Sequence, residues 1–170
     1  MFVDESGFYL LPAVVRTYAP VGNTPIIREY VSHKHLSAIS AITPEGKLYM
    51  MVQEQAYKGQ HVVGFLMHLL ECIPGKLMVI WDGAPIHQAH EVRDFLADGA
   101  EARLHLERLP GYAPDLNPAE GIWKHLKHVE LKNLSCQDLP HLRAELRKAK
   151  ERLRHKTHII KACVTQPGLY

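Results

Sequence analysis

The segment that most constrains the fold is Leu77–Trp81, five apolar residues in a row followed directly by Asp82 and Gly83. Such a run, ended by a charged residue and a glycine, is typical of a central β-strand covered on both faces. The apolar segment 60–73 before it ends at a Pro-Gly pair, which predicts a helix. The order strand, helix, strand over residues 77–109 predicts two parallel strands joined by a right-handed crossover.

The other segments complete a mixed α/β pattern. Thr43–Gly46 has Pro at its second position, which indicates a turn between the two strands of a hairpin. Gly7 is expected to bend the chain after a short first strand, and Phe8–Leu10 can then pair back or continue. The predicted strands span 2–4, 35–42, 47–53, 77–81 and 103–109, and the predicted helices span 60–73, 87–98, 118–131 and 139–154. This order predicts a three-layer α/β fold with a mixed central sheet flanked by helices.

Composition excludes several classes of protein. The chain has 170 residues, of which 46% are hydrophobic and 22% charged, as expected for one globular domain. Its three cysteines are widely spaced and form no CxxC pair, which indicates a reducing compartment without a thiolate zinc site. No apolar run approaches the roughly 18 residues that span a bilayer, and no signal peptide is apparent. We therefore expect a cytoplasmic protein without membrane contact.

Three carboxylates occupy positions at which this fold can bring them together. Asp4 ends or interrupts the first predicted strand, Asp82 follows the apolar strand, and Glu120 lies in the first turn of the next-to-last predicted helix. If the two strands are neighbours, Asp4 and Asp82 meet at one edge of the sheet and Glu120 closes the site. Cleavage of a phosphodiester requires charge stabilisation at two oxygens, which two Mg²⁺ ions roughly 3.5–4 Å apart supply. Because Mg²⁺ prefers oxygen ligands and converging acids repel one another, the pattern predicts a metal site.

Each acid also has a structural interpretation, which the sequence leaves open. Asp4 could mark the end of a strand, and Asp82 could belong to a turn with the glycine that follows it. Asn117 and Glu120 suit the N-cap and N3 positions of a helix, so Glu120 could complete a capping box. Asp115, in the preceding loop, is a substitute ligand.

Basic side chains on the last two predicted helices are candidate DNA contacts. Lys124 and Lys127 share a helical face with Glu120 and could hold phosphates, although a Glu120–Lys124 pair within the helix is an alternative. His87 could orient Asp82, contact phosphate or simply begin a helix. The last helix carries a basic face that predicts contact with the DNA backbone, or else a solvated surface. Its candidate contacts are Arg143, Arg147, Lys150 and Arg154.

Three motifs resemble the DDE domain of mariner-like insertion-sequence transposases. They are Asp4–Phe8 (DESGF), Trp81–His87 (WDGAPIH) and Leu109–Trp123 (LPGYAPDLNPAEGIW). The stretch Tyr112–Glu120 is the most specific, and Arg16–Gly22 is similar to the family's segment between the first strands. The resemblance extends from residue 2 to about residue 133.

The resemblance implies an RNase H-like fold with Asp4, Asp82 and Glu120 as a catalytic triad that binds two ions of Mg²⁺ or Mn²⁺. It implies hydrolysis at transposon ends and then attack of the freed 3′-hydroxyl on target DNA. The implied partners are double-stranded DNA and, as an option, a second copy of the chain in a homodimer. Two features depart from the family: Gly83 stands where relatives often have Asn, and no helix-turn-helix domain precedes Asp4.

We therefore expect residues 1–134 to form a DDE catalytic domain, with a basic C-terminal helix and tail, 135–170, packed on it. One alternative is another RNase H-like nuclease without strand transfer. Another is a truncated, inactive remnant that binds DNA or a partner without cutting. The Tyr112–Glu120 motif favours the transposase, and the three acids argue against a remnant. The terminal repeats and the target sequence are not specified by these motifs.

Overall fold

Strands and helices alternate through most of the chain. The computed structural model describes residues 1–11, 13–16, 18–23, 26, 34–110 and 116–165. In chain order the elements are β1 (Phe2–Tyr9), β2 (His35–Ile42), β3 (Leu48–Gln53), α1 (Gly59–Cys72), β4 (Leu77–Trp81), η1 (Pro85–Gln88), α2 (His90–Ala97), η2 (Ala100–Ala102), β5 (Leu104–Arg108), α3 (Ala119–His125), η4 (Leu126–Glu130), α4 (Leu139–Arg154) and α5 (Thr157–Val164).

The five strands form one mixed sheet in the order β3-β2-β1-β4-β5. β1, β2 and β3 pair antiparallel, whereas β4 pairs in parallel with both β1 and β5. The predicted hairpin is confirmed, because Gly46 N donates to Thr43 O at 2.9 Å and Gly46 has a φ of 84°. The parallel pair β4–β5, joined through α2, is confirmed as well.

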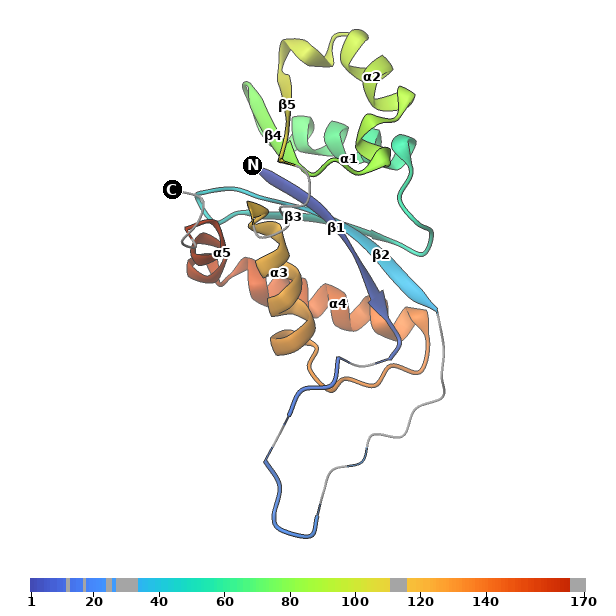
Figure 1. The fold of residues 1–170 in the computed structure, drawn as a ribbon, viewed down its shortest axis with the longest axis vertical. Helices are drawn as coiled ribbons and strands as arrows, with labels where there is room; N and C mark the ends of the chain where they lie inside the picture. The colour runs from blue at the N-terminus through green and yellow to red at the C-terminus, as the bar shows by residue number, and fades with distance from the viewer. Residues whose placement is uncertain (12, 17, 24–25, 27–33, 111–115, 166–170) are drawn as a thin grey trace.

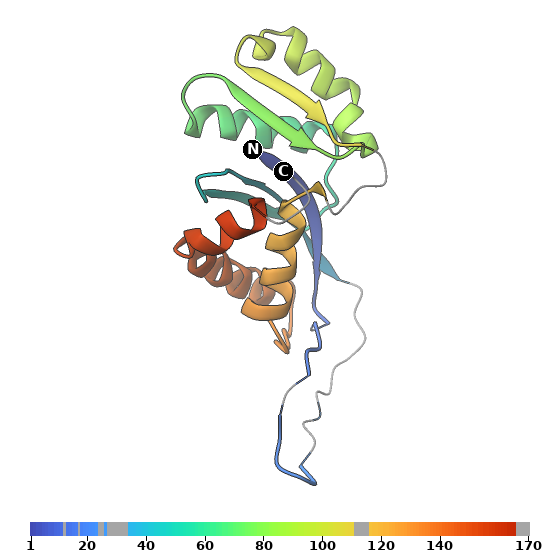
Figure 2. The same cartoon turned by 60° about the vertical axis from the view of Figure 1, so that its left-hand side comes forward.

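The sheet separates two hydrophobic cores. In β2, Leu36 and Ile42 pack towards α3, η4, α4 and α5, whereas Ile39 and Ala41 pack towards α1 and α2. Figures 1 and 2 show these two groups of helices on opposite faces of the sheet. Since side chains alternate along a strand, a sheet covered on both faces needs apolar residues at successive positions. The predicted three-layer α/β fold is confirmed.

The same alternation in β1 determines which way its polar residues face. Phe8 lies in the core with α3, where its ring meets Trp123 edge-on at 5.9 Å, and Val3 lies in the core with α1. Asp4 and Ser6 share the parity of Phe8 and therefore face α3, whereas Glu5 faces η1. Asp4 and Glu5, which are adjacent in β1, therefore face opposite helical layers.

Several local predictions are wrong. Gly7 does not bend the chain, because β1 stays paired with β2 along its whole length to Tyr9. The helix expected over 87–98 is divided into η1 and α2, since Ala89 between them is extended with ψ 153°. Met67 of α1 and Met78 of β4 are half-exposed, so these elements bury one face rather than both.

The C-terminal helix α5 was not expected from the sequence. Its Ile160, Cys163 and Val164 are buried in the same core as α3 and α4. Within the described residues, Cys72, Cys136 and Cys163 form no disulfide. Within the described ranges, no helix combines the length and the apolar character required to cross a membrane.

Glu130, at the end of η4, joins that segment to the C-terminal helices. Its carboxylate accepts hydrogen bonds from Arg152 Nε and Lys156 Nζ, each at 2.6 Å. Burial alone would raise the pKa of Glu130, but these two cations outweigh it and lower the pKa to about 2.

Glu130→Gln should lower the free energy of unfolding by about 2 kcal/mol at neutral pH, the range of a hydrogen bond to a charged group. Because the folded pKa of about 2 lies below the ordinary 4.5, this stabilisation is complete above pH 4.5 and is lost as pH falls through 2. Urea unfolding should show a constant deficit between about pH 7 and 5 that shrinks in stronger acid. A deficit independent of pH would contradict the ion-pair account.

Candidate active site

Asp4 and Asp82 lie on adjacent parallel strands. Phe2 of β1 is opposite Ile80 of β4, so Asp4 and Asp82 each follow two residues beyond this pair. The predicted neighbourhood of the two strands is confirmed, and Asp82 is the first residue after β4 as expected. Asp4, however, lies inside β1 rather than at its end.

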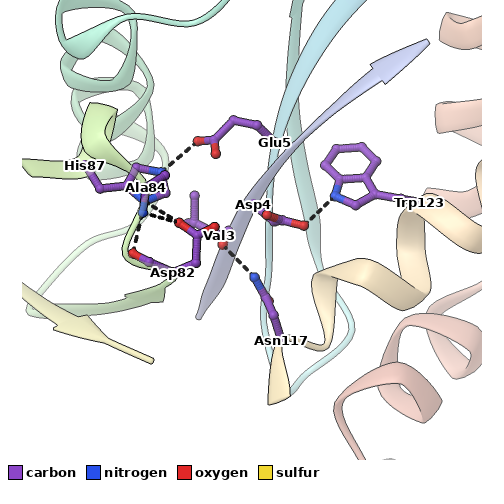
Figure 3. Close-up of polar contacts among 8 residues, drawn as sticks. All are labelled: Val3, Asp4, Glu5, Asp82, Ala84, His87, Asn117 and Trp123. Carbon is purple, nitrogen blue, oxygen red and sulfur yellow. Dashed lines mark hydrogen bonds and ion pairs between the residues drawn. The ribbon is translucent and has the colours of Figure 1, made fainter. Parts of the chain in front are cut away.

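Asp4 is buried, with only 7% of its surface exposed, and its Oδ2 accepts a hydrogen bond of 2.9 Å from Trp123 Nε1 (Figure 3). Burial raises the pKa of Asp4, and the negative charge of Glu120 raises it further, to about 7. The Trp123 hydrogen bond lowers this pKa without offsetting the other two effects. Asp4 therefore lies in a negative potential that a nearby cation would relieve.

Glu120 is exposed in the first turn of α3, as predicted. The start of this helix is fixed by Asn117, whose Oδ1 accepts from Ala119 N at 3.2 Å and whose Nδ2 donates to Val3 O at 3.2 Å. Among the described residues, no hydrogen bond joins the Glu120 carboxylate to Asn117, so the capping box is incomplete. Asn117 thus joins α3 to β1 and keeps the Glu120 carboxylate near Asp4.

Asp82 is held on the other side of β1 by a histidine. His87 Nδ1 lies 2.9 Å from Asp82 Oδ1, and His87 Nε2 lies 3.0 Å from Glu5 Oε1 (Figure 3). The imidazole also stacks on Trp81, with centroids 4.2 Å apart and planes 3° from parallel. Burial would lower the pKa of His87, but the hydrogen bond and charge of Glu5, with those of Asp82, raise it overall.

The structure therefore brings two of the three predicted acids together and keeps the third apart. Asp4 and Glu120 influence each other electrostatically, whereas the Asp82 carboxylate contacts His87 and the Ala84 amide. In the described part of the chain, no group of three or more His, Cys, Asp or Glu side chains is placed to hold one metal ion. Asp115, the substitute ligand, and most of the loop before α3 lie outside the described residues.

The two predicted lysines of the site differ in their surroundings. Lys127 Nζ donates to Ser6 Oγ at 2.7 Å and lies 5.4 Å from the centre of the Phe8 ring. Burial lowers the pKa of Lys127, while Glu120 and Asp4 raise it in opposition. Lys124 is exposed, and within the described residues it forms no ion pair with Glu120. The intrahelical pair considered from the sequence is therefore not formed.

The predicted basic residues of α4 lie partly along the edge strand β3. Arg143, Arg147 and Lys150 line a groove of about 200 Å³ whose apolar residues include Val52 and Leu146. Arg143 also donates to the main-chain oxygen of Val52 at 3.2 Å. Arg154 points elsewhere, forming a 3.4 Å pair with an acid of its own helix.

Gly83, which departs from the resembling family, has a local explanation. The guanidinium of Arg108, from the end of β5, fills the space beside it, and a Cβ on Gly83 would lie 2.6 Å from Arg108 Cζ. A side chain at position 83 would therefore displace this guanidinium. Arg108 is exposed, and no ion pair to it is formed within the described residues.

Sequence reasoning missed two functional contacts. Glu5 was not singled out, although alternation in β1 could have placed it opposite Asp4. Trp123 is buried in the core, and nothing in the sequence indicated that its indole would donate to Asp4.

Comparisons with known proteins bear on the family and the fold of the chain. The family model described as DDE superfamily endonuclease matches residues 1–143. The chain resembles the Mos1 transposase paired-end complex with left transposon end (TM-score 0.66, 18% identity, 99% of this chain and 55% of that one). It also resembles the mariner Mos1 paired-end complex with Mg (TM-score 0.64, 21% identity, 99% of this chain and 55% of that one). A further similar structure is the catalytic domain of Mos1 mariner transposase (TM-score 0.58, 18% identity, 99% of this chain and 83% of that one).

The chain thus spans about half the length of the first of these structures, and the likeness confirms the expected RNase H-like fold. A search of curated protein sequences finds no match.

Asp4→Asn should stabilise the metal-free protein, because it removes a buried charge and retains an acceptor for Trp123. The folded pKa of about 7 exceeds the ordinary 3.8, so ionisation of Asp4 costs stability increasingly as pH rises from 3.8 to 7. Above pH 7 the variant should melt about 5 °C higher than the wild type, equivalent to roughly 2 kcal/mol for this chain length. Calorimetry in the presence of a chelator should show that the gain in melting temperature disappears near pH 4. A melting temperature of the variant below that of the wild type at pH 8 would refute this prediction.

Proposed function

The chain belongs to the DDE superfamily endonuclease family, and from this premise we propose that it is the catalytic domain of a DNA transposase. Its reaction would be hydrolysis of phosphodiester bonds at transposon ends, followed by transfer of the freed strand to target DNA. One observation carries this proposal: a buried Asp4 with its pKa raised beside Glu120, on the strand adjacent to Asp82. The similar structures named as transposase complexes support the same function.

We infer that Asp4, Asp82 and Glu120 hold divalent metal, two ions of Mg²⁺ or Mn²⁺. Related structures are named as complexes with Mn and with Mg. The donor set fits, since carboxylate oxygens suit these hard ions and the negative potential at Asp4 favours a cation. When bound, the ions would stabilise charge on the attacking and leaving oxygens. Asp82 offers Oδ2 for this purpose, because only its Oδ1 is hydrogen-bonded among the described residues.

The chain's own side chains would keep these carboxylates in place. Trp123 donates to Oδ2 of Asp4, and the main chain of Glu5 is a second hydrogen-bond donor to this carboxylate. Asn117 joins the first turn of α3 to β1, which keeps Glu120 beside Asp4. Ordered carboxylates reduce the reorganisation that would otherwise accompany ligand binding.

We propose double-stranded DNA, at transposon ends and target, as the partner. Lys124 and Lys127 would contact phosphates near the acids, and Arg143, Arg147, Lys150 and Arg154 would contact the backbone along α4. We also propose that the chain forms a homodimer and is located on DNA in the cytoplasm. Residues 1–134 would form the catalytic domain, and residues 135–170 would form a C-terminal part packed on it.

The alternative, an RNase H-like nuclease without strand transfer, would not form the joined product. A transposase joins a short duplex with a recessed 3′-hydroxyl to a plasmid, whereas such a nuclease only cuts the DNA. An inactive remnant would give neither product.

Asp82→Asn should abolish nicking of plasmid DNA that depends on Mg²⁺ or Mn²⁺, with little loss of thermal stability, because it removes a ligand and not a core contact. Glu120→Gln should have the same effect, each by at least about 100-fold, as expected for loss of a metal-dependent step. Agarose gels of nicked plasmid, beside melting curves, provide the measurement. If Glu120→Gln retained nicking, Glu120 would not be a metal ligand.

A triple variant, Arg143→Ala with Arg147→Ala and Lys150→Ala, should weaken DNA binding and make it less sensitive to salt. Each lost phosphate contact reduces the slope of log affinity against log salt by about 0.9, so the slope should fall by roughly 2.7. Lys148→Ala is the matched control, because Lys148 lies on the same helix and pairs with Glu145 at 2.7 Å. Fluorescence anisotropy with a labelled duplex measures both, and an unchanged slope in the triple variant would exclude this face as a DNA contact.

A further inference from the structure

We propose that His87 is a positioning residue, which fixes one oxygen of the Asp82 carboxylate so that the other is presented to a divalent cation. The inference rests on the proposed function, because it gives Asp82 the role of a metal ligand. It assigns to Glu5 the task of anchoring His87 from β1.

The contacts around Asp82 are divided unequally between its two oxygens. Oδ1 accepts from Ala84 N at 2.8 Å and lies 2.9 Å from His87 Nδ1. Among the described residues, Oδ2 has no hydrogen-bond donor, and the side chain of Asp82 is 53% exposed. A carboxylate held through one oxygen keeps one rotamer and leaves its second oxygen for an ion.

His87 is itself held so that its ring cannot turn. The residue is only 5% exposed, lies in the 3-10 turn η1, and stacks on Trp81 with nearly parallel rings. Its Nδ1 also lies 3.2 Å from the main-chain oxygen of Asp82, and its Nε2 lies 3.0 Å from Glu5 Oε1. Both ring nitrogens thus face acceptors, an arrangement that is satisfied when each carries a hydrogen.

Glu5 connects His87 to the central strand β1. It lies between Asp4 and Ser6 in β1, and alternation directs it away from α3 and towards η1. Within the described residues, the only side-chain hydrogen bond of the Glu5 carboxylate is to His87. The chain Glu5–His87–Asp82 therefore connects the strand that carries Asp4 to the residue that follows β4 (Figure 3).

Two conservative variants separate positioning from general packing. The amide nitrogen of Asn replaces the Nδ1 of histidine, so His87→Asn retains a donor to Asp82 and loses the contact with Glu5. The amide nitrogen of Gln replaces the Nε2 of histidine, so His87→Gln retains the contact with Glu5 and loses the contact with Asp82. Both remove the stacking on Trp81, and the two replacement side chains differ by a single methylene group.

The test is calorimetric titration of the purified 170-residue chain with Mn²⁺ alone, without DNA. His87→Gln should weaken Mn²⁺ binding by about tenfold or more, the range found when a group that orients a metal ligand is removed. His87→Asn should recover most of the wild-type affinity. His90→Ala, an exposed histidine paired with Glu91, is the control and should bind Mn²⁺ as the wild type does.

The outcomes distinguish this inference from the proposed function. Equal Mn²⁺ affinity in the wild type and both His87 variants would overturn the positioning role and leave the transposase proposal intact. Equal losses in the Asn and Gln variants, with matching falls in melting temperature, would assign His87 to packing alone and also overturn it. Absence of Mn²⁺ binding by the folded wild type would overturn the metal site and this inference together.

Discussion

The alternation of side chains along β1 is the constraint on which the site depends. β1 lies in the middle of the sheet and is covered on both faces, so neighbouring residues must enter different layers. Asp4 consequently meets Trp123 and Glu120 on the α3 side, while Glu5 meets His87 on the η1 side. A shift of one residue in this strand would exchange the two acids and bury apolar side chains against the wrong layer.

The site is arranged at some expense of stability. A carboxylate buried beside a second acid favours its neutral form, which is why the pKa of Asp4 rises to about 7. At Glu130, by contrast, Arg152 and Lys156 neutralise the buried carboxylate. This difference between Asp4 and Glu130 is expected if bound cations, rather than basic side chains of the protein, balance the charges of Asp4 and Glu120.

The parts of the fold that follow from local pattern could be predicted. The apolar run Leu77–Trp81 and the leucine spacing of α4 gave strand and helix with the bounds observed. The parallel neighbourhood of Asp4 and Asp82 was a condition of the predicted site rather than a consequence of the order of elements, and the pairing of Phe2 with Ile80 meets this condition. By contrast, α5 buries only a few residues, and the division between η1 and α2 depends on the backbone at Ala89, so neither left a clear periodic signal. Contacts between distant residues, such as His87 with Glu5, depend on register and could not be read from spacing.

The central claim is that Asp4, Asp82 and Glu120 together bind divalent metal. It is tested most directly by anomalous diffraction from crystals of this chain grown with Mn²⁺. The account predicts manganese density between Asp4, Glu120 and Oδ2 of Asp82, with Oδ1 of Asp82 still on His87. Manganese bound away from these carboxylates, or a fully folded protein that binds none at saturating Mn²⁺, would contradict it.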